Sequence, residues 1–274
     1  MSTDSPTSDT QAYDPVDTSK ASVARAYDYI LGGKDNYAAD RAFVETMLQR
    51  DPEAKISARL NKDFGSRAVD YIARQGVTQF LDLGSGIPTS PPSVHETARR
   101  VHSDTKVVYV DHDPVVVAHN RALRATGPGL AIIQESFMSL DAVFGHDDFL
   151  ANIDTSRPVG VLMLSVLQNN TDEQIRAMLD VLNARLAPGS FLAVSHVSSR
   201  TSDVFLDAVT KEIAAGRYPP TDFRTDERIA EFFTGYELVE PGIVDYRDWR
   251  PNQRQADDRP DLKTMMSGAV GVLR

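Results

Sequence analysis

The stretch Phe80–Gly86 reads FLDLGSG, an apolar run followed by two closely spaced glycines. Glycine turns the backbone sharply and lets a ligand approach it closely, and open α/β sheets bind ligands where a strand ends in such a turn. The stretch therefore predicts a buried strand and a binding site at Asp82 and the Gly84-Ser85-Gly86 loop. An ordinary strand-to-helix turn is the alternative.

The chain after Gly76 alternates short apolar runs with helical patterns, which is typical of parallel β-α-β units. The expected strands are 79–83, 107–110, 131–133, 159–165, 191–195, 236–239 and 269–273. Helix starts between them resemble capping boxes at 93–96 and 171–174, and an N-cap at Asp113 before Pro114. The expected fold class is therefore α/β and Rossmann-like.

The segment before Gly76 has a different pattern. Residues 1–20 are rich in Ser, Thr, Asp and Pro without apolar periodicity, so we expect a disordered tail. Residues 21–76 have helical periodicity, with one helix from Ser22, a second capped by Asp40 and a third that ends at Gly76. We expect a helical cap over 21–76 and a Rossmann-like domain over 77–274.

The composition limits the partners and the compartment. The net charge of −10 disfavours binding to nucleic acid. The chain has no cysteine, which excludes disulfides and favours a reducing cytoplasm. No signal peptide is evident, and the most apolar run, Val159–Leu167, is too short to span a membrane. The histidines have no metal-ligand spacing, so we expect no metal site.

The second expected strand, VVYVD, ends in Asp111. An acidic residue there, roughly 20 or more positions after the glycines, is placed to bind ribose hydroxyls. A dinucleotide fingerprint would need glycine at position 89, where the chain has Thr89, and Pro88, Pro91 and Pro92 delay the next helix. A ligand with ribose but no phosphate fits better, and an NAD(P)-dependent oxidoreductase is the less favoured alternative.

Several longer motifs together cover residues 22–274 almost continuously. They are SVARAYDYILGGKDNYAAD (22–40), FLDLGSGIPT (80–89), VVYVDHDPVVVAHNRAL (107–123), LAPGSFLAVSH (186–196), FFTGYELVEPGIV (232–244) and GAVGVLR (268–274). Their combination resembles the actinobacterial S-adenosyl-L-methionine-dependent methyltransferase family formerly called DUF574, and the first motif is the most distinctive.

The resemblance implies a class I methyltransferase fold, a seven-stranded mostly parallel sheet whose last strand is antiparallel, with an N-terminal helical cap. It implies S-adenosyl-L-methionine as the cofactor, with methionine at the glycine loop and ribose at Asp111 beside His112. The loop Glu135-Ser136-Phe137 would flank adenine. Ser165 would face cofactor or substrate, unless it is a buried hydroxyl bonded to backbone.

The glycine pair in YDYILGGKDNY, residues 27–37, ends a helix early, because two glycines inside a helix cost about 2 kcal/mol. Its place in the first motif favours a lid that bends over the sheet edge. The lid would bring four residues to the cofactor or the acceptor, namely Tyr29, Gly33, Lys34 and Asn36. Lys34 would then pair with the cofactor carboxylate. A plain helix end with a solvated loop is the alternative.

Two residues are candidates for catalysis, His196 after the fifth parallel strand and Tyr29 in the lid, and a structural histidine is the alternative at 196. The family commonly has two histidines after the fourth strand, where this chain has Gln168-Asn169. We expect methyl transfer to an unknown, small-molecule methyl acceptor. A non-catalytic regulator that binds S-adenosyl-L-methionine is the alternative, and a homodimer is left open.

Overall fold

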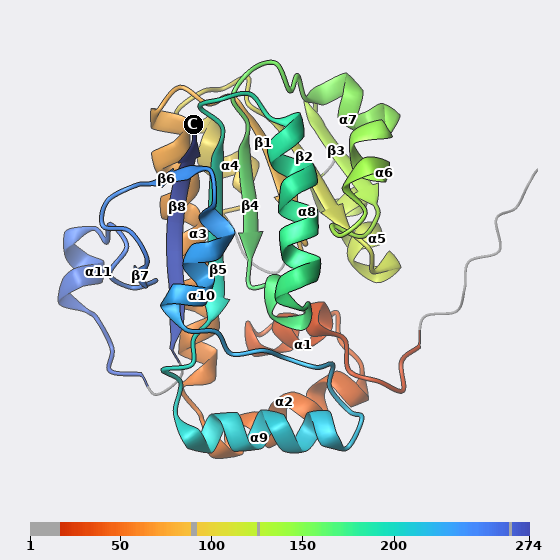
Figure 1. Ribbon diagram of the computed structural model, residues 1–274. Coiled ribbons are helices and arrows are strands. Elements are labelled where there is room, and N and C mark those ends of the chain that lie inside the picture. The colour runs from red at the N-terminus through yellow and green to blue at the C-terminus, as the bar shows by residue number, and fades with distance from the viewer. Residues whose placement is uncertain (1–16, 89–91, 125–126, 263–264) are drawn as a thin grey trace, which may run out of the picture.

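The sheet of this protein has the strand order β3-β2-β1-β4-β5-β8-β6 (Figure 1). The computed structural model describes residues 17–88, 92–124, 127–262 and 265–274. The strands are β1 Gln79–Leu83, β2 Lys106–Asp111, β3 Leu130–Gln134, β4 Gly160–Leu164, β5 Phe191–Val197, β6 Tyr236–Leu238, β7 Val244–Asp245 and β8 Met266–Leu273. β8 runs antiparallel to both β5 and β6. The expected seven-stranded sheet is confirmed, and the short β7, which the sequence did not predict, pairs with β8.

Helices cover both faces of this sheet because neighbouring strand residues point to opposite sides. Phe80 packs with α3 (Ala54–Arg74), α4 (Val94–Arg99) and α5 (Pro114–Leu123). Leu81 packs on the other side with α6 (Leu140–Gly145), α7 (Asp147–Asn152) and α8 (Asp172–Arg185). The remaining short elements are α10 Asp226–Ala230, α11 Gln253–Asp257 and 3-10 turns at Leu167–Asn169 and Glu231–Phe233. The core is therefore two apolar layers divided by the sheet.

Three helices lie across the carboxyl ends of the strands: α1 (Val23–Ile30), α2 (Ala38–Arg50) and α9 (Asp203–Ala214) (Figure 1). Their apolar faces form a third cluster. Phe43 of α2 stacks on Tyr218, which follows α9, with ring centroids 4.1 Å apart. The segment expected as a cap, residues 21–76, is thus divided, because α1 and α2 join α9 while α3 lies against the sheet.

Most of the expected helix starts are confirmed. Ser93 and Thr171 open capping boxes, and the carboxylate of Asp113 accepts the N–H of Val115. Asp40 was predicted to be the N-cap of the second helix, and this prediction is wrong. Asp40 lies at the third helical position of α2, because its carboxylate accepts the N–H of the N-cap residue Tyr37 at 2.8 Å. The expected tail falls mostly on residues 1–16, which lie outside the described residues.

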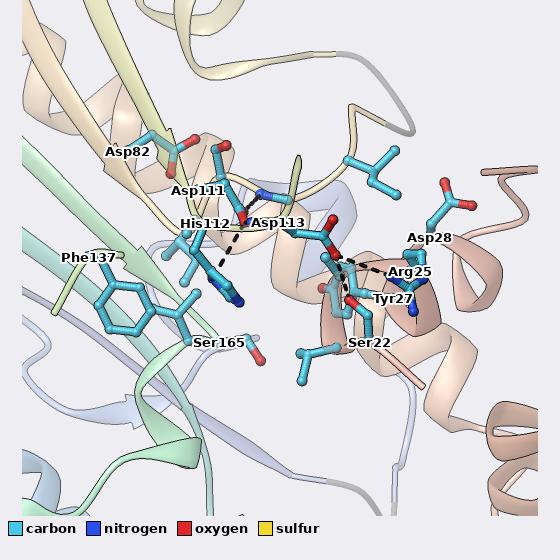
Figure 2. Close-up of a pocket in the computed structure, with 18 of the residues that line it drawn as sticks. Ser22, Arg25, Tyr27, Asp28, Asp82, Asp111, His112, Asp113, Phe137 and Ser165 are labelled. Atoms are coloured by element: carbon cyan, nitrogen blue, oxygen red, sulfur yellow. Dashed lines mark hydrogen bonds and ion pairs between the residues drawn. The ribbon is translucent and has the colours of Figure 1, made fainter. Parts of the chain in front are cut away.

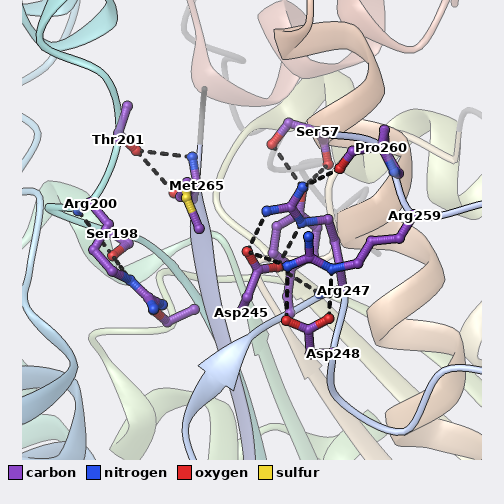
Figure 3. A network of polar contacts seen from close by, with 12 residues as sticks. Ser57, Ser198, Arg200, Thr201, Asp245, Arg247, Asp248, Arg259, Pro260 and Met265 are labelled. Atoms are coloured by element: carbon purple, nitrogen blue, oxygen red, sulfur yellow. Dashed lines mark hydrogen bonds and ion pairs between the residues drawn. The ribbon is translucent and has the colours of Figure 1, made fainter. Parts of the chain in front are cut away.

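Charged side chains fix the long connection between β7 and β8 (Figure 3). Arg247, almost fully buried, pairs with Asp245 at the end of β7 and donates to the carbonyl of Pro260. Arg259 pairs with Asp248 at 2.7 Å. These contacts hold the connection beside Ser267 and Gly268 of β8, the part of that strand with which β7 pairs.

Candidate active site

A cavity of about 1000 Å³ lies between the carboxyl ends of the strands and the cap. One side of the cavity is formed by the turns after β1, β2, β3 and β4. The opposite side is formed by α1 and residues 216–219 after α9, both in the cap, and by α3. Figure 2 shows this division, with Asp82, Asp111 and Phe137 on one side and Arg25 and Tyr27 on the other. The sheet therefore brings the ends of four separate strands to one chamber.

The glycine loop after β1 and the carboxylate of Asp111 form one unit. One carboxylate oxygen of Asp111 accepts the N–H of Gly86 at 3.0 Å, and the other accepts the N–H of Asp113 at 3.0 Å. Gly84 and Gly86 have φ of +76° and +61°, which disfavours any other residue type. Each carboxylate oxygen can accept a second hydrogen bond. Asp111 therefore keeps acceptor capacity toward the cavity that it lines.

The other residues expected around the ligand divide into two groups. His112, Ser136 and Phe137 line the cavity, and the imidazole of His112 is largely exposed. Glu135 does not line it, which corrects its predicted contact with adenine. The backbone N–H of Glu135 donates to the carbonyl of Asp111, and this extension of the strand pairing turns the loop so that Ser136 and Phe137 face the cavity instead.

Ser165 lines the cavity in a strained conformation, with φ of +57°. Non-glycine residues rarely adopt such values, and they persist where the surroundings hold them. The amide of Gln168 does so here, donating to the carbonyl of Ser165 at 2.7 Å and lying 3.3 Å from its hydroxyl. Asn169 donates to the carbonyl of Pro220 at 2.8 Å. The Gln168-Asn169 pair thus shapes the wall after β4 and joins it to the segment after α9.

The match to known families agrees with this arrangement. Residues 9–274 match the S-adenosyl methyltransferase family. The chain belongs to this family. Its members use S-adenosyl-L-methionine, so this methyltransferase is an enzyme with that cofactor. The oxidoreductase alternative is set aside, and Thr89 and Pro91, on which part of that argument rested, lie outside the described residues.

Two solved structures resemble this methyltransferase over nearly its whole length. A DUF574 family protein from Streptomyces avermitilis is 35% identical, with a TM-score of 0.88, over 95% of this chain and 100% of that one. A protein from Thermobifida fusca, described only provisionally as a methyltransferase, is 33% identical, with a TM-score of 0.85, over 94% and 97%. The comparison with curated proteins finds no match. The resemblance expected from the motifs is therefore confirmed.

The structure does not bring the residues predicted from the glycine-pair stretch to the cavity, since Tyr29, Gly33, Lys34 and Asn36 are not among the residues that line it. Tyr29 lies half-buried on the outside of the cap, where its hydroxyl donates to Glu45. Lys34 is exposed.

Tyr27 and Asp28 line the cavity in their place. One oxygen of the buried Asp28 carboxylate accepts the N–H of Asp35 at 2.9 Å and the amide of Asn36 at 2.8 Å. The stretch folds back on Asp28 because Gly32, with φ of +85°, reverses the chain. Asn36 is therefore turned toward Asp28 rather than toward a ligand.

This turn explains both glycines and gives a test. A Cβ on Gly33 would lie 1.9 Å from an oxygen of Asp28, whereas a Cβ on Gly32 would meet nothing within 4 Å. Gly33→Ala is expected to lower the free energy of unfolding by about 2 kcal/mol through overpacking. Gly32→Ala, the matched control, pays only for its backbone conformation, about 1 kcal/mol. Urea unfolding of both variants measures the difference, and a cost at position 33 no larger than at 32 would contradict this account.

His196 is a structural histidine, which was the alternative to its role as a candidate general base. The imidazole is fully buried and does not line the cavity. Its Nε2 lies 2.8 Å from Nη1 of Arg224 and its Nδ1 lies 2.8 Å from the carbonyl oxygen of Val197. Because a guanidinium only donates, Nε2 accepts and Nδ1 carries the proton. Burial lowers the pKa of His196 to about 4, and the neutral ring is the one that fits.

The neutral state of His196 predicts a pH dependence of stability. The pKa of His196 in the folded protein lies below the usual histidine value of 6.5, so the unfolded chain binds the extra proton between pH 6.5 and about 4. The stabilisation is complete above pH 6.5 and is lost as the pH falls through this range. Wild-type protein should lose about 2 kcal/mol more unfolding free energy between pH 7 and pH 5 than His196→Gln.

Chemical unfolding at both pH values measures this contrast. The carboxyl of Asp82, whose pKa burial raises to about 6, contributes in the opposite direction but equally in both proteins. Parallel pH profiles of the two proteins would show that His196 is not held neutral.

Several cavity residues carried no signal in the sequence. Asn61 and Lys62 of α3 and Arg124 at the end of α5 line the cavity beside Asp82. They belong to helices that are distant in sequence, and no local motif marks them. Apolar spacing along α3 predicts its buried face, but it gives no indication that polar residues on the same helix border a chamber. That these polar residues lie at one cavity can be seen only in the folded structure.

The described part of the chain also bears on two expected absences. It contains no cluster of histidine and carboxylate side chains suited to a metal ion. In the same part of the chain, no helix has the length and apolarity needed to cross a membrane. The cytoplasmic location, the domain boundaries and the homodimer stay predictions.

Proposed function

We propose that this methyltransferase transfers the methyl group of S-adenosyl-L-methionine to a small molecule bound in the same cavity. The observation that carries the proposal is the cavity of about 1000 Å³ that Asp111 and the glycine loop line. This is the upper end of the range of roughly 300–1000 Å³ for small-molecule sites. Such a cavity has room for a cofactor and a modest acceptor together, and the cap hinders access by a macromolecule.

The residues on the sheet side fit the cofactor. Asp111 has free acceptor capacity for the two ribose hydroxyls, and the turn Gly84–Gly86 lets the backbone approach the methionine chain. Ser136 and Phe137 supply a polar edge and an aromatic ring for adenine. When bound, S-adenosyl-L-methionine supplies a methyl group already activated by its sulfonium. The protein therefore has to orient the acceptor, and orientation can supply roughly 7–11 kcal/mol of the barrier.

The cap is joined directly to the cofactor side, which favours exclusion of water. The hydroxyl of Ser22 donates to the carboxylate of Asp113 at 3.1 Å, and Arg25 contacts the same oxygen at 3.4 Å. Arg25 also pairs with the buried Asp40 of α2 at 2.9 Å. Asp113 lies two positions after Asp111, so α1 and α2 close over the proposed ribose site.

One observation favours a non-catalytic role, namely that few groups at the cavity could remove a proton from an acceptor. Gln168 and Asn169 use their amides to hold Ser165 and Pro220. Among the described residues that line the cavity, His112 is the only imidazole. Proton removal by histidine therefore depends on one largely exposed ring. Acceptors that reach the site without a proton on the attacking atom would need no such base.

The test has a binding arm and a turnover arm. S-adenosylhomocysteine and S-adenosyl-L-methionine should raise the melting temperature, while NADH should not. A methyl-labelled donor incubated with a cell extract should label the fraction that passes a small-pore filter. Label confined to the retained macromolecules would overturn the small-molecule acceptor. Binding without S-adenosylhomocysteine formation in any fraction would favour the non-catalytic role.

A further inference from the structure

Arg124 is a buried cation in the wall of the cavity, within electrostatic range of Asp82. It follows α5, its relative exposure is 8%, and it lines the cavity. Its guanidinium lies over the ring of Tyr109, with 4.8 Å between Cζ and the ring centroid. Its Nε and Nη1 are buried and have no hydrogen-bond partner within the described chain. The guanidinium therefore has donors that the protein itself does not satisfy.

An unsatisfied guanidinium is costly in such a place. A guanidinium cannot lose its proton at ordinary pH, and a buried charge without a hydrogen-bonding partner destabilises the folded state. The contact with Tyr109 offsets only part of this, since cation–π contacts contribute about 0.5–2 kcal/mol. Groups left unpaired at a cost to stability are typical of ligand sites.

Two more charged side chains line the same cavity, Lys62 from α3 and Asp82 from β1. Burial and the charge of Arg124 together lower the pKa of Lys62 to about 8, although the carboxylates of Asp82 and Asp28 act in the opposite direction. Arg124 also opposes the burial that raises the pKa of Asp82 to about 6. The three groups therefore lie within electrostatic range of one another. Asp28, which also lines the cavity, acts on Lys62 as well, so two cations and two carboxylates meet here. Nε and Nη1 of Arg124 still have no acceptor among the described residues.

No ion pair joins Arg124 to Asp82 in the part of the chain that the structure describes. Asp82 is two residues before Gly84, where the methionine part of the cofactor is proposed to lie. The guanidinium of Arg124, with its unsatisfied donors, is thus next to the proposed path of an amino acid group. It also lies on the side of the cavity that α3 closes.

We propose that Arg124 and Lys62 form an anion subsite that binds a carboxylate inside the cavity. The inference rests on the proposed function. It places the pairing with a carboxylate, which the sequence predicted for Lys34, at two residues that line the cavity. The carboxylate has two chemical sources. One is the amino acid end of the cofactor, and the other is an acidic group on the acceptor.

Three variants test the subsite. Arg124→Met and Lys62→Met remove one charge each and keep an unbranched side chain. Arg121→Met is the matched control, because Arg121 is an exposed residue of the same helix that does not line the cavity. The probes are S-adenosylhomocysteine, which has the carboxylate, and 5′-methylthioadenosine, which lacks the whole amino acid part. Benzoate, added with saturating S-adenosylhomocysteine, represents an acidic acceptor.

If the cofactor supplies the carboxylate, Arg124→Met and Lys62→Met should each weaken S-adenosylhomocysteine about 10- to 100-fold, as loss of a charged hydrogen bond predicts. Their affinity for 5′-methylthioadenosine should stay within about 2-fold of wild type. If the acceptor supplies it, both nucleosides should bind normally and only benzoate binding should be lost. Arg121→Met should change none of these. Unchanged binding of all three probes to the Arg124 and Lys62 variants would overturn the subsite.

Stability separates this role from a structural one. Removing an unpaired buried charge should leave the melting temperature of ligand-free Arg124→Met equal to or above that of wild type. A large drop in the melting temperature would show that Arg124 supports the fold instead. Arg124→Lys would then be used for the same titrations. We expect this variant to retain part of the S-adenosylhomocysteine or benzoate binding. Failure of wild-type protein to bind 5′-methylthioadenosine would count against the proposed cofactor site at Asp111, not against the subsite.

Discussion

Asp111→Ala is expected to weaken binding of S-adenosylhomocysteine by at least about 100-fold. The proposed contacts are two hydrogen bonds from ribose hydroxyls to a carboxylate, each contributing about 1.5–3 kcal/mol, and about 3 kcal/mol corresponds to roughly 100-fold in affinity. The substitution also leaves the N–H groups of Gly86 and Asp113 without the oxygens that they now contact at 3.0 Å. The glycine loop therefore loses its fixed position as well. Isothermal titration calorimetry measures the effect.

Two further variants separate the ribose contact from the loop. Asp111→Asn keeps one acceptor oxygen and should give an intermediate loss. Asp104→Asn is the control, because Asp104 is exposed and does not line the cavity. Its affinity should stay within about 5-fold of wild type. Wild-type affinity in Asp111→Ala would remove the ribose assignment and with it the anchor of the proposed site.

The sheet side of the site could be predicted because it depends on local patterns. A buried parallel strand is a short apolar run, and its carboxyl end is a known place for ligands. Asp111 and the loop Gly84–Gly86 needed no knowledge of distant residues. The structure adds only the hydrogen bond that joins them, between the N–H of Gly86 and Asp111.

The cap side could not be predicted in this way. The direction of the chain after the glycine pair depends on the φ of Gly32 and on the carboxylate of Asp28, which draws Asn36 inward. A sequence shows that a helix ends there but not which side chains face a cavity. The sequence therefore predicts a contact for Lys34, which does not line the cavity, while Lys62, which does, is the residue proposed to make it.

His196 shows the same limit at the end of a strand. The rule that strand ends carry functional residues correctly directed attention to the edge of β5. The strand, however, continues to Val197, and Arg224 covers the imidazole from 28 residues further on. Whether a polar residue at a strand end meets solvent or a buried partner is decided by such non-local contacts.

Arg224→Met is expected to lower the free energy of unfolding by about 3–5 kcal/mol, as removal of one partner from a buried ionic network does. The guanidinium is fully buried. It donates to Asp172 at 2.7 Å, to Nε2 of His196 at 2.8 Å and to the carbonyl of Asn170 at 2.6 Å. Methionine fills a similar volume but leaves all three acceptors without this donor. Urea unfolding at pH 7 measures the loss.

Arg228→Met is the matched control, because Arg228 pairs with the same Asp172 at 2.6 Å while 38% of its side chain is exposed. Exposed ion pairs contribute about 1 kcal/mol or less, so its cost should be several-fold smaller than that of Arg224→Met. The two losses should also differ in what they do to the cavity. Arg224 holds Asn170, which lines the cavity beside Asn169. Folded Arg224→Met should therefore bind S-adenosylhomocysteine more weakly than Arg228→Met does. Equal losses for the two variants, in unfolding free energy and in affinity, would contradict the larger role of the buried guanidinium.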